Sequence, residues 1–300
     1  MFSKSSIARK GEVCAYRLGG PDAYVRAFVE AGKVKLAQVG LNGARSLKDL
    51  PLSAKKHVSV LLLGPEAYAF GLVPTPLALG GTDKVLEAVK WAFAKDSDVD
   101  MENAVCEFLH VQGSETGGAL LKDSHWVFAI EPARLASLMK LCSESRLKIE
   151  VVDTVATAQR NLCYSEVRHG VSREGGYASI VVGEESSSIN IASWTGDLLF
   201  HKQMEWSASA LQSLDAKERL LVDLQRNLGY FERRLASFAL VRGVVFGRGA
   251  EELAAYLTRG LGSFDWAPAA YPEVDFSLCA GAHALGGDDA LLIGSLMRWA

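Results

Sequence analysis

The chain has 300 residues, of which 49% are hydrophobic and 22% are charged, and its formal net charge is −3. This length and composition supply a large core, divided between two lobes or held in one large α/β unit. The small net charge and the lack of a long basic run exclude an electrostatic surface for nucleic acid or for an anionic membrane. The longest apolar run, residues 58–64, is far shorter than the ~20 residues that a membrane-spanning helix needs.

The N-terminus and the cysteines indicate the cellular compartment. The basic start has no apolar run behind it, so it does not read as a secretory signal. The cysteines are scattered, odd in number and never in a Cys-x-x-Cys pair, which favours reduced thiols packed among apolar neighbours. These features predict a soluble cytoplasmic protein. The cysteines are Cys14, Cys106, Cys142, Cys163 and Cys279.

The first half of the chain begins with alternating apolar and polar residues, which predict a meander of three strands. Glycine-containing turns separate these strands, and a more apolar fourth strand follows. Helical spacing then predicts a helix over 82–95, capped by Thr82 or Asp83, and a second helix that begins at Pro132. The strands are expected at 12–18, 23–30, 33–41, 56–64, 104–112 and 124–132.

The second half repeats this order. A strand at 148–152 leads through a cap, Asp153 or Thr154, into a helix, and a second meander follows. Its strands are expected at 177–182, 188–194 and 198–205, followed by a helical region at 208–236, a strand at 240–247 and helices at 250–262 and 286–300. Because no short-period repeat accompanies it, this is a duplication of architecture and not a solenoid.

Two meander-led halves, each with a turn suited to cupping phosphate, resemble the actin-like ATPase fold. The segment 85–112 has a helix, an acidic turn and then a strand, and it resembles the inserted subdomain of PilM-like proteins, the pilus biogenesis components. Their relatives include MshI-type proteins of MSHA pili and the cytoplasmic part of GspL of type II secretion. The segment 148–162 resembles the return into the first lobe, and the stretches "SWTGDLLFHKQMEWSASALQ" and "DLQRNLGYFERRLASFALVRGVVFGRGAEELAAYL" resemble the second lobe.

The resemblance implies an α/β fold with two actin-like lobes, duplicated meander-led sheets and an inserted small α+β subdomain. Residues 1–72 would form the first lobe, completed by 148–172 and the C-terminal helix 287–300. Residues 73–147 would form the inserted subdomain. Residues 173–286 would form the second lobe, with a reduced helical insertion.

Any nucleotide would be cradled, by this resemblance, at three glycine- or serine-containing turns: Gly19, Gly20, Ser186, Ser187, Gly247 and Gly249. The chemistry at these turns is degenerate. The first strand lacks the terminal Asp of the family pattern, and Pro21 has no N–H to offer phosphate. Val182 stands where the second Asp belongs, and Glu184 and Glu185 would repel a triphosphate.

Several readings therefore remain open. Glu184 or Glu185 would serve an unusual magnesium site, and Asp153 would be either a water-positioning carboxylate or a helix cap. The turn 247–249 is either an adenosine-side loop or only a tight turn before a helix. The six histidines show no metal-ligand spacing, and no catalytic serine motif is present, so neither a metal site nor a catalytic residue is expected. Three tryptophans would be partner anchors or core residues: Trp206, Trp266 and Trp299.

The leading hypothesis is a cytoplasmic pseudo-actin scaffold without enzymatic activity and without a cofactor. It would lie at the inner face of the inner membrane, in a type IV (MSHA-type) pilus or type II secretion platform. As the resemblance implies, it would bind the N-terminal tail of a PilN-like bitopic membrane protein, in a groove lined from residues 73–111 and the first-lobe strands, and would link the platform to a cytoplasmic motor ATPase. The alternative is an active actin-like ATPase or small-molecule kinase that binds Mg-ATP between the lobes. A third reading is a polymerising structural subunit.

Overall fold

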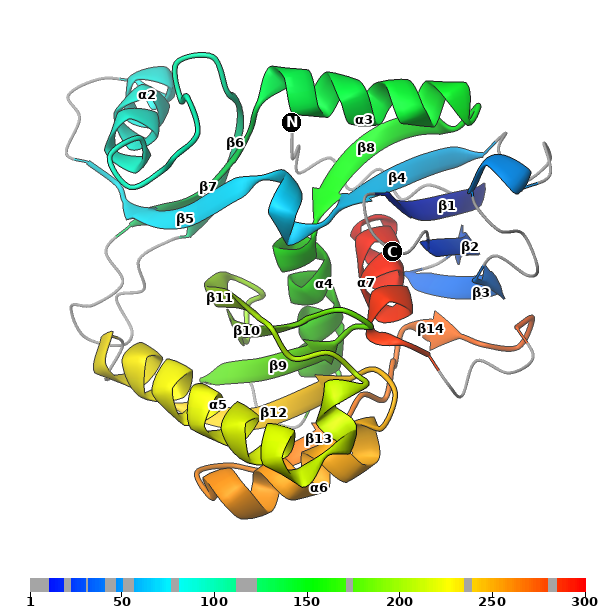
Figure 1. The fold of residues 1–300 in the computed structure, drawn as a ribbon, viewed down its shortest axis with the longest axis vertical. Coiled ribbons are helices and arrows are strands. Elements are labelled where there is room, and N and C mark those ends of the chain that lie inside the picture. Colours follow the sequence, from blue (N-terminus) through cyan, green and yellow to red (C-terminus); the bar gives the residue numbers. More distant parts are fainter. Residues whose placement is uncertain are drawn as a thin grey trace.

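A computed structural model describes residues 11–18, 23–30, 32–40, 47–50, 57–76, 81–111, 123–170, 175–234, 239–279 and 285–300. Within these residues the chain forms three sheets, with helices between and outside them (Figure 1).

The first sheet has the strand order β14-β3-β2-β1-β4-β8. Its antiparallel meander consists of β1 (Gly11–Leu18), β2 (Ala23–Glu30) and β3 (Lys33–Val39). Parallel pairing then adds β4 (Val58–Leu63) to β1 and β8 (Lys148–Thr154) to β4, while β14 (Val274–Asp275) returns from the second half to pair with β3. The apolar β4 is nearly fully buried, as expected for a strand inside a sheet.

The second sheet repeats this plan, in the order β11-β10-β9-β12-β13. A meander of β9 (Gly176–Val182), β10 (Ser187–Ser193) and β11 (Leu198–Met204) is extended in parallel by β12 (Leu240–Phe246) and β13 (Trp266–Pro268). In each sheet the first strand of the meander, β1 or β9, pairs with the first parallel strand that follows, β4 or β12. The two sheets therefore share one strand order, and the duplication predicted from the sequence is confirmed.

The third sheet lies between β4 and β8 in the chain and is antiparallel, with the order β5-β7-β6. Its strands are β5 (Ala69–Pro74), β6 (Val105–Val111) and β7 (Ser124–Ile130). Helix α2 (Thr82–Phe93) packs on β5 and β7, and α3 (Pro132–Glu144) runs along β8. We call this unit the insert.

Two helices lie between the first and second sheets (Figure 1). Helix α4 (Val155–Arg168) contacts β9 and β10, and α7 (Gly287–Leu296) contacts β1 and β2. The two helices approach closely at Gly294, where an added Cβ would lie 2.3 Å from the carbonyl oxygen of Ala158. Helices α5 (Leu214–Arg234) and α6 (Ala250–Leu261) lie on the outer side of the second sheet, and short 3-10 turns occur at Leu47–Asp49, Pro65–Ala67, Ala210–Gln212 and Met297–Trp299.

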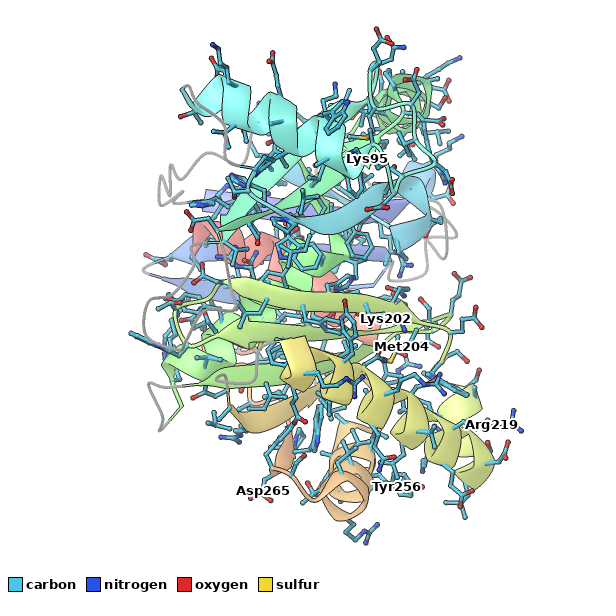
Figure 2. The ribbon with its side chains drawn as sticks, turned by 90° about the vertical axis from the view of Figure 1, so that its left-hand side faces the viewer. Lys95, Lys202, Met204, Arg219, Tyr256 and Asp265 are labelled. Atoms are coloured by element: carbon cyan, nitrogen blue, oxygen red, sulfur yellow. The ribbon has the colours of Figure 1, made fainter. Side chains whose placement is uncertain are left out.

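A continuous hydrophobic core connects the insert to the second lobe. It runs from Phe128 and Trp126 of β7 to Leu198 of β11 and on to Phe231 of α5. The indole Nε1 of Trp126 donates a hydrogen bond to the carbonyl oxygen of Leu198 at 2.7 Å. Figure 2 shows the insert, with Lys95, directly above the strand that carries Lys202 and Met204. The insert is therefore packed against the second lobe through β7.

The structure changes several local predictions. Helix α2 is capped by Gly81 without a side-chain hydrogen bond, so the prediction of Thr82 or Asp83 as its cap is wrong. Helix α5 begins at Leu214 and not at residue 208, because a 3-10 turn precedes it. The strands β5, β13 and β14 were not predicted from the sequence. Of the cysteines, Cys14, Cys142 and Cys163 are buried, the other two are half-buried, and all are free.

No helix within the described ranges combines the length and apolar character needed to cross a bilayer.

Candidate functional site

A groove with a volume of about 320 Å³ lies between the first sheet and the insert. The strands β4, β6, β7 and β8 and the helix α3 contribute to its walls, and most of the lining side chains are apolar. Tyr68 is buried in the wall, and burial raises the pKa of its phenol well above the ordinary value, so the ring stays neutral. The lining residues are Leu63, Tyr68, Val105, Glu107, Phe128, Ala129, Ile130, Leu135, Glu150, Val151, Val152, Thr154 and Arg298.

Two strand edges meet at this groove. Among the described strands, β6 pairs only with β7 and β8 pairs only with β4, so each is an edge of its sheet. Both contribute side chains to the groove, Val105 and Glu107 from β6 and Glu150, Val151 and Val152 from β8. A strand edge offers main-chain N–H and C=O groups to an extended peptide, and the apolar pocket beside it accepts alternate side chains. The arrangement is suited to binding a peptide.

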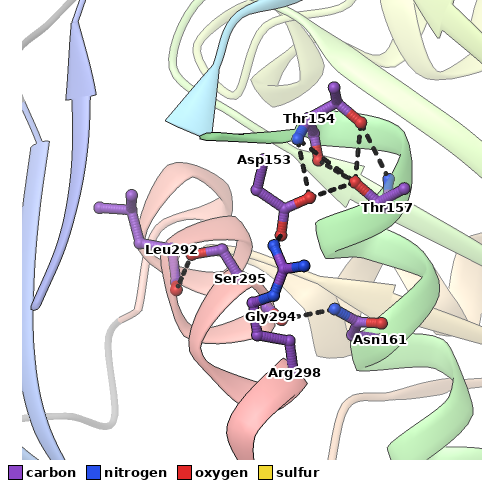
Figure 3. Close-up of polar contacts among 8 residues, drawn as sticks. All are labelled: Asp153, Thr154, Thr157, Asn161, Leu292, Gly294, Ser295 and Arg298. Atoms are coloured by element: carbon purple, nitrogen blue, oxygen red, sulfur yellow. Dashed lines mark hydrogen bonds and ion pairs between the residues drawn. The ribbon is translucent and has the colours of Figure 1, made fainter. Parts of the chain in front are cut away.

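An ion pair between the end of β8 and the C-terminal residues borders the groove (Figure 3). The Oδ2 atom of Asp153, at the end of β8, lies 3.6 Å from the Nη1 atom of Arg298, which follows α7. The other carboxylate oxygen of Asp153 accepts hydrogen bonds from the backbone N–H of Thr154 at 2.9 Å and from the Thr157 hydroxyl. Burial raises the pKa of Asp153, and the Arg298 guanidinium opposes this rise.

The same close-up identifies the cap of α4. Thr154 is the N-cap, and it exchanges hydrogen bonds with Thr157 in a capping box. Of the two caps considered for this helix, the structure therefore selects Thr154, with Asp153 supporting it through Thr157. These contacts give Asp153 a structural position between β8, α4 and the C-terminal residues.

The second predicted phosphate turn is a tight β9–β10 hairpin. The backbone N–H of Gly183 donates to the carbonyl oxygen of Ser186 at 2.9 Å. Ser186 accepts a hydrogen bond from Gln203 at 2.7 Å, and Ser187 is buried in β10. The two serine hydroxyls are therefore not displayed together at the turn.

The anion-binding groups of this turn are already engaged by the chain itself. Asp288, in the first turn of α7, accepts the backbone N–H of Glu184 at 3.1 Å and forms an ion pair with Arg17 of β1. The Glu184 side chain lies 3.5 Å from Arg248. The Asp288 carboxylate thus already binds the Glu184 N–H and the Arg17 guanidinium, and the Glu184 carboxylate lies beside the Arg248 guanidinium. Because these anion-binding groups already have carboxylate partners, the residues present do not fit a magnesium triphosphate here.

The third turn borders a separate cavity of about 660 Å³. Gly247 and Gly249 both have positive φ, and Gly249 is the N-cap of α6. They line the cavity together with residues of the segment 268–271 and with Phe276. The turn is thus a tight connection into a helix that also faces a cavity.

The first predicted phosphate turn and the three tryptophans remain to be placed. Gly19 and Gly20 lie outside the described residues. Trp266 is buried in the core, whereas Trp206 and Trp299 are half-buried. Among the residues that the structure describes, no group of three or more His, Cys, Asp or Glu side chains could hold a metal ion.

The structure brings three residues into these sites that were not predicted from the sequence. Asp288, Arg17 and Arg298 are not among the site residues predicted from the sequence. A signal existed for Arg17, because a charged residue near the end of the apolar strand β1 has to find a partner when it is buried. Nothing in the sequence indicated that the partner is Asp288, 271 positions away.

The chain resembles known proteins in its structure, and no match was found from its sequence. No protein-family model and no curated protein matches the chain. A structure of the "PilM-PilN type IV pilus biogenesis complex" superposes with a TM-score of 0.70 over 97% of this chain and 100% of that chain, at 18% identity. A Bacteroides thetaiotaomicron protein of unknown function with an actin-like ATPase fold matches with a TM-score of 0.50 over 97% and 98% of the two chains, at 12% identity. This chain has the actin-like ATPase fold.

A third structure of this fold comes from a secretion system. The cytoplasmic domain of EpsL, an inner-membrane component of the type II secretion system of Vibrio cholerae, matches with a TM-score of 0.50 and 9% identity, over 95% of each chain. The structural likeness to PilM and to the EpsL cytoplasmic domain, expected from the sequence, is confirmed. At these identities the matches establish the actin-like fold only, and the two-lobed α/β class predicted from the sequence is confirmed with it.

Proposed function

We propose that this chain is a pseudo-actin scaffold of a type IV (MSHA-type) pilus or type II secretion inner-membrane platform. It binds the cytoplasmic N-terminal tail of a PilN-like membrane protein. The observation that carries the proposal is the groove between β6 and β8, where two strand edges face an apolar pocket. Such a site captures an extended peptide through main-chain hydrogen bonds and side-chain pockets, without a catalytic centre.

Two further observations support the proposal. The fold matches the solved PilM–PilN complex over nearly the whole length of both chains. The position between the lobes where phosphates would be held is occupied by Asp288, which is paired with Arg17. In this proposal the protein works by binding. It lies at the inner face of the inner membrane and links the platform to a cytoplasmic motor ATPase.

The groove differs in detail from the one expected from the sequence. Val105 and Glu107 come from the expected segment 73–111, and Leu63 comes from a first-lobe strand. The walls also include β7, α3 and Arg298, which were not expected there. The peptide would therefore contact the C-terminal residues as well as the first lobe and the insert.

The proposal is tested by isothermal titration of a peptide that copies the tail of a PilN-like partner. Val105 is 44% exposed on β6 and lines the groove, whereas Val241 is 38% exposed on β12 of the second lobe. We expect Val105→Asp to weaken binding at least tenfold, because it places a charge against apolar peptide side chains, which is worth about 1.4 kcal/mol or more. Val241→Asp is the matched control and should leave the affinity unchanged.

Two results would contradict the proposal. One is no binding of the peptide to the unmodified protein at millimolar concentration. The other is an equal loss of affinity in the two variants, which would place the peptide away from the groove.

The alternative function, an active actin-like ATPase or small-molecule kinase, is favoured by the cavity beside Gly247 and Gly249. A thermal melt with Mg-ATP separates the two functions. A ligand at 100 times its Kd adds about 2.7 kcal/mol to the free energy of unfolding, which raises the melting temperature by several degrees. The scaffold proposal expects no such rise at millimolar Mg-ATP.

A further inference from the structure

Three segments that are far apart in the sequence meet at the end of β9. Arg17 comes from β1 in the first lobe, the turn at Gly183 and Glu184 belongs to the second lobe, and Asp288 stands at the start of α7. One oxygen of Asp288 pairs with the Arg17 guanidinium, and the other accepts the Glu184 backbone N–H at 3.1 Å. The side chains of Arg17 and Asp288 are 8% and 14% exposed, so water weakens this pair little.

The groups around Asp288 are those that bind an anion. A backbone N–H at a hairpin turn, a guanidinium and the N-terminal end of a helix all favour negative charge. An arginine paired with a carboxylate makes a strong, charge-assisted hydrogen bond. The carboxylate of Asp288 therefore satisfies, from within the chain, a set of donors that would otherwise accept a phosphate group.

The backbone around this contact leaves no room for side chains. A Cβ on Gly287 would lie 2.1 Å from the carbonyl oxygen of Val182, and a Cβ on Gly247 would lie 2.6 Å from the same oxygen. A Cβ on Gly183 would lie 3.0 Å from Asp288 itself. The tip of α7 is thus seated directly on the end of β9, and this seating aims Asp288 at both lobes.

We propose that Asp288 is a tethered anion that takes the place of a phosphate and latches the two lobes together. The lobes are held closed by the chain's own carboxylate, so closure needs no bound ligand. In this account the Arg17–Asp288–Glu184 contact, which we call the latch, is a device of the fold. The latch does not depend on the partner proposed above, because neither Arg17 nor Asp288 lines the groove.

The neighbouring residue Asp289 supplies a matched control. Its carboxylate accepts the backbone N–H of Gly286 at 3.0 Å, within the start of its own helix. Asp288 and Asp289 are thus adjacent acids in the same helical turn. Of the two acids, it is Asp288 that pairs with Arg17 and accepts the backbone N–H of Glu184 in the β9–β10 turn.

The first test measures melting temperatures in potassium phosphate and in potassium chloride of equal ionic strength. Asp288→Ala removes the tethered anion and leaves Arg17 and the Glu184 N–H facing an open space. We expect phosphate to raise the melting temperature of Asp288→Ala by several degrees relative to chloride, and to leave the unmodified protein and Asp289→Asn unaffected. Adding Arg17→Gln to Asp288→Ala should abolish the gain. An identical phosphate response in Asp288→Ala and Asp289→Asn would overturn the proposal.

A second test covers the case in which Asp288→Ala does not fold. Asp288→Asn keeps the shape of the side chain and removes its charge. Amide hydrogen exchange followed by mass spectrometry should rise in residues 13–18 and 183–187 of Asp288→Asn and stay unchanged in Asp289→Asn. Equal exchange in the two variants would show that Asp288 does not hold the lobes together. Neither test uses the peptide, so the latch and the scaffold function fail independently.

Discussion

At the scale of single residues, His201 illustrates how the core uses polar side chains. Its Nδ1 donates to the side-chain oxygen of Asn190, whose amide nitrogen in turn donates to the carbonyl oxygen of Ala156 at 2.9 Å. The ring also makes an edge contact with Phe70 of the insert. Burial lowers the pKa of His201 to about 3, so the imidazole is neutral throughout the physiological range.

This histidine predicts a pH dependence of stability. In the unfolded chain His201 has its ordinary pKa of 6.5, so below pH 6.5 the unfolded state binds a proton that the folded state does not. The free energy of unfolding therefore falls as the pH falls from 6.5 towards 3. Between pH 7 and pH 5 the unmodified protein should lose about 2 kcal/mol more than His201→Asn, which retains the donor to Asn190 but cannot titrate.

The measurement is urea denaturation of both proteins at the two pH values. The comparison of variants is needed because burial raises the pKa of Asp153 and of Glu166, and raised carboxyl pKa values act in the opposite direction at acid pH. Equal losses of stability in the two proteins would contradict the assignment of His201 as a buried neutral group.

At the scale of elements, helix α4 is the connection between the two sheets. It begins where β8 of the first sheet ends and packs against β9 and β10 of the second. Its fully buried Gln159 donates to the carbonyl oxygens of Ser179 at 2.9 Å and Ser188 at 3.2 Å, and accepts from the Ser188 hydroxyl at 2.6 Å. One amide thus links the helix to two neighbouring strands.

Replacing this amide should be costly. Gln159→Leu removes the two N–H donors and the acceptor of the amide while the Ser188 hydroxyl and the two carbonyls stay buried, so we expect a loss of about 3 kcal/mol in the free energy of unfolding. Gln212, an exposed residue whose amide makes only a 3.4 Å bond to Ala208, is the control, and Gln212→Leu should change stability by less than about 0.5 kcal/mol. Chemical denaturation of the two variants compares them, and similar small losses would contradict the bridging role.

The elements themselves were largely predictable, and the exceptions have physical reasons. Alternation in residues 23–30 reflects a strand with one face in the core, and the structure places β2 there. The strand β5 was missed because Gly71 and Pro74 weaken its strand signal, and its pairing with β7 depends on tertiary contacts. The two-residue β14 is too short to carry a periodic signal.

Site residues were less predictable than elements. The turns were found because glycine and serine clusters mark turns in any sequence. The side chain that contacts the β9–β10 turn was not predicted, because Asp288 and Asp289 look alike in sequence and only the fold places one of them against Arg17. The groove likewise draws Leu135 and Arg298 from outside the segment that was expected to line it.

At the scale of the whole molecule, two further contacts join the two lobes of like strand order besides the helices α4 and α7. On one side is the latch at Asp288, and on the other Trp126 of the insert donates to Leu198 of the second lobe. The groove lies on the insert side, and Phe128, two residues after Trp126, is part of its wall. We therefore expect contacts within the chain to set the shape of the groove.

The central claim is that the groove binds the partner's tail peptide without a nucleotide. Calorimetric titration of that peptide, carried out with and without Mg-ATP, tests it most directly. The account predicts binding in both conditions, with dissociation constants that agree within about twofold, because an agent that does not bind cannot shift an equilibrium. Val105→Asp should weaken the binding equally in both. Peptide binding that occurs only in the presence of Mg-ATP would contradict the account and would make the chain a nucleotide-dependent switch.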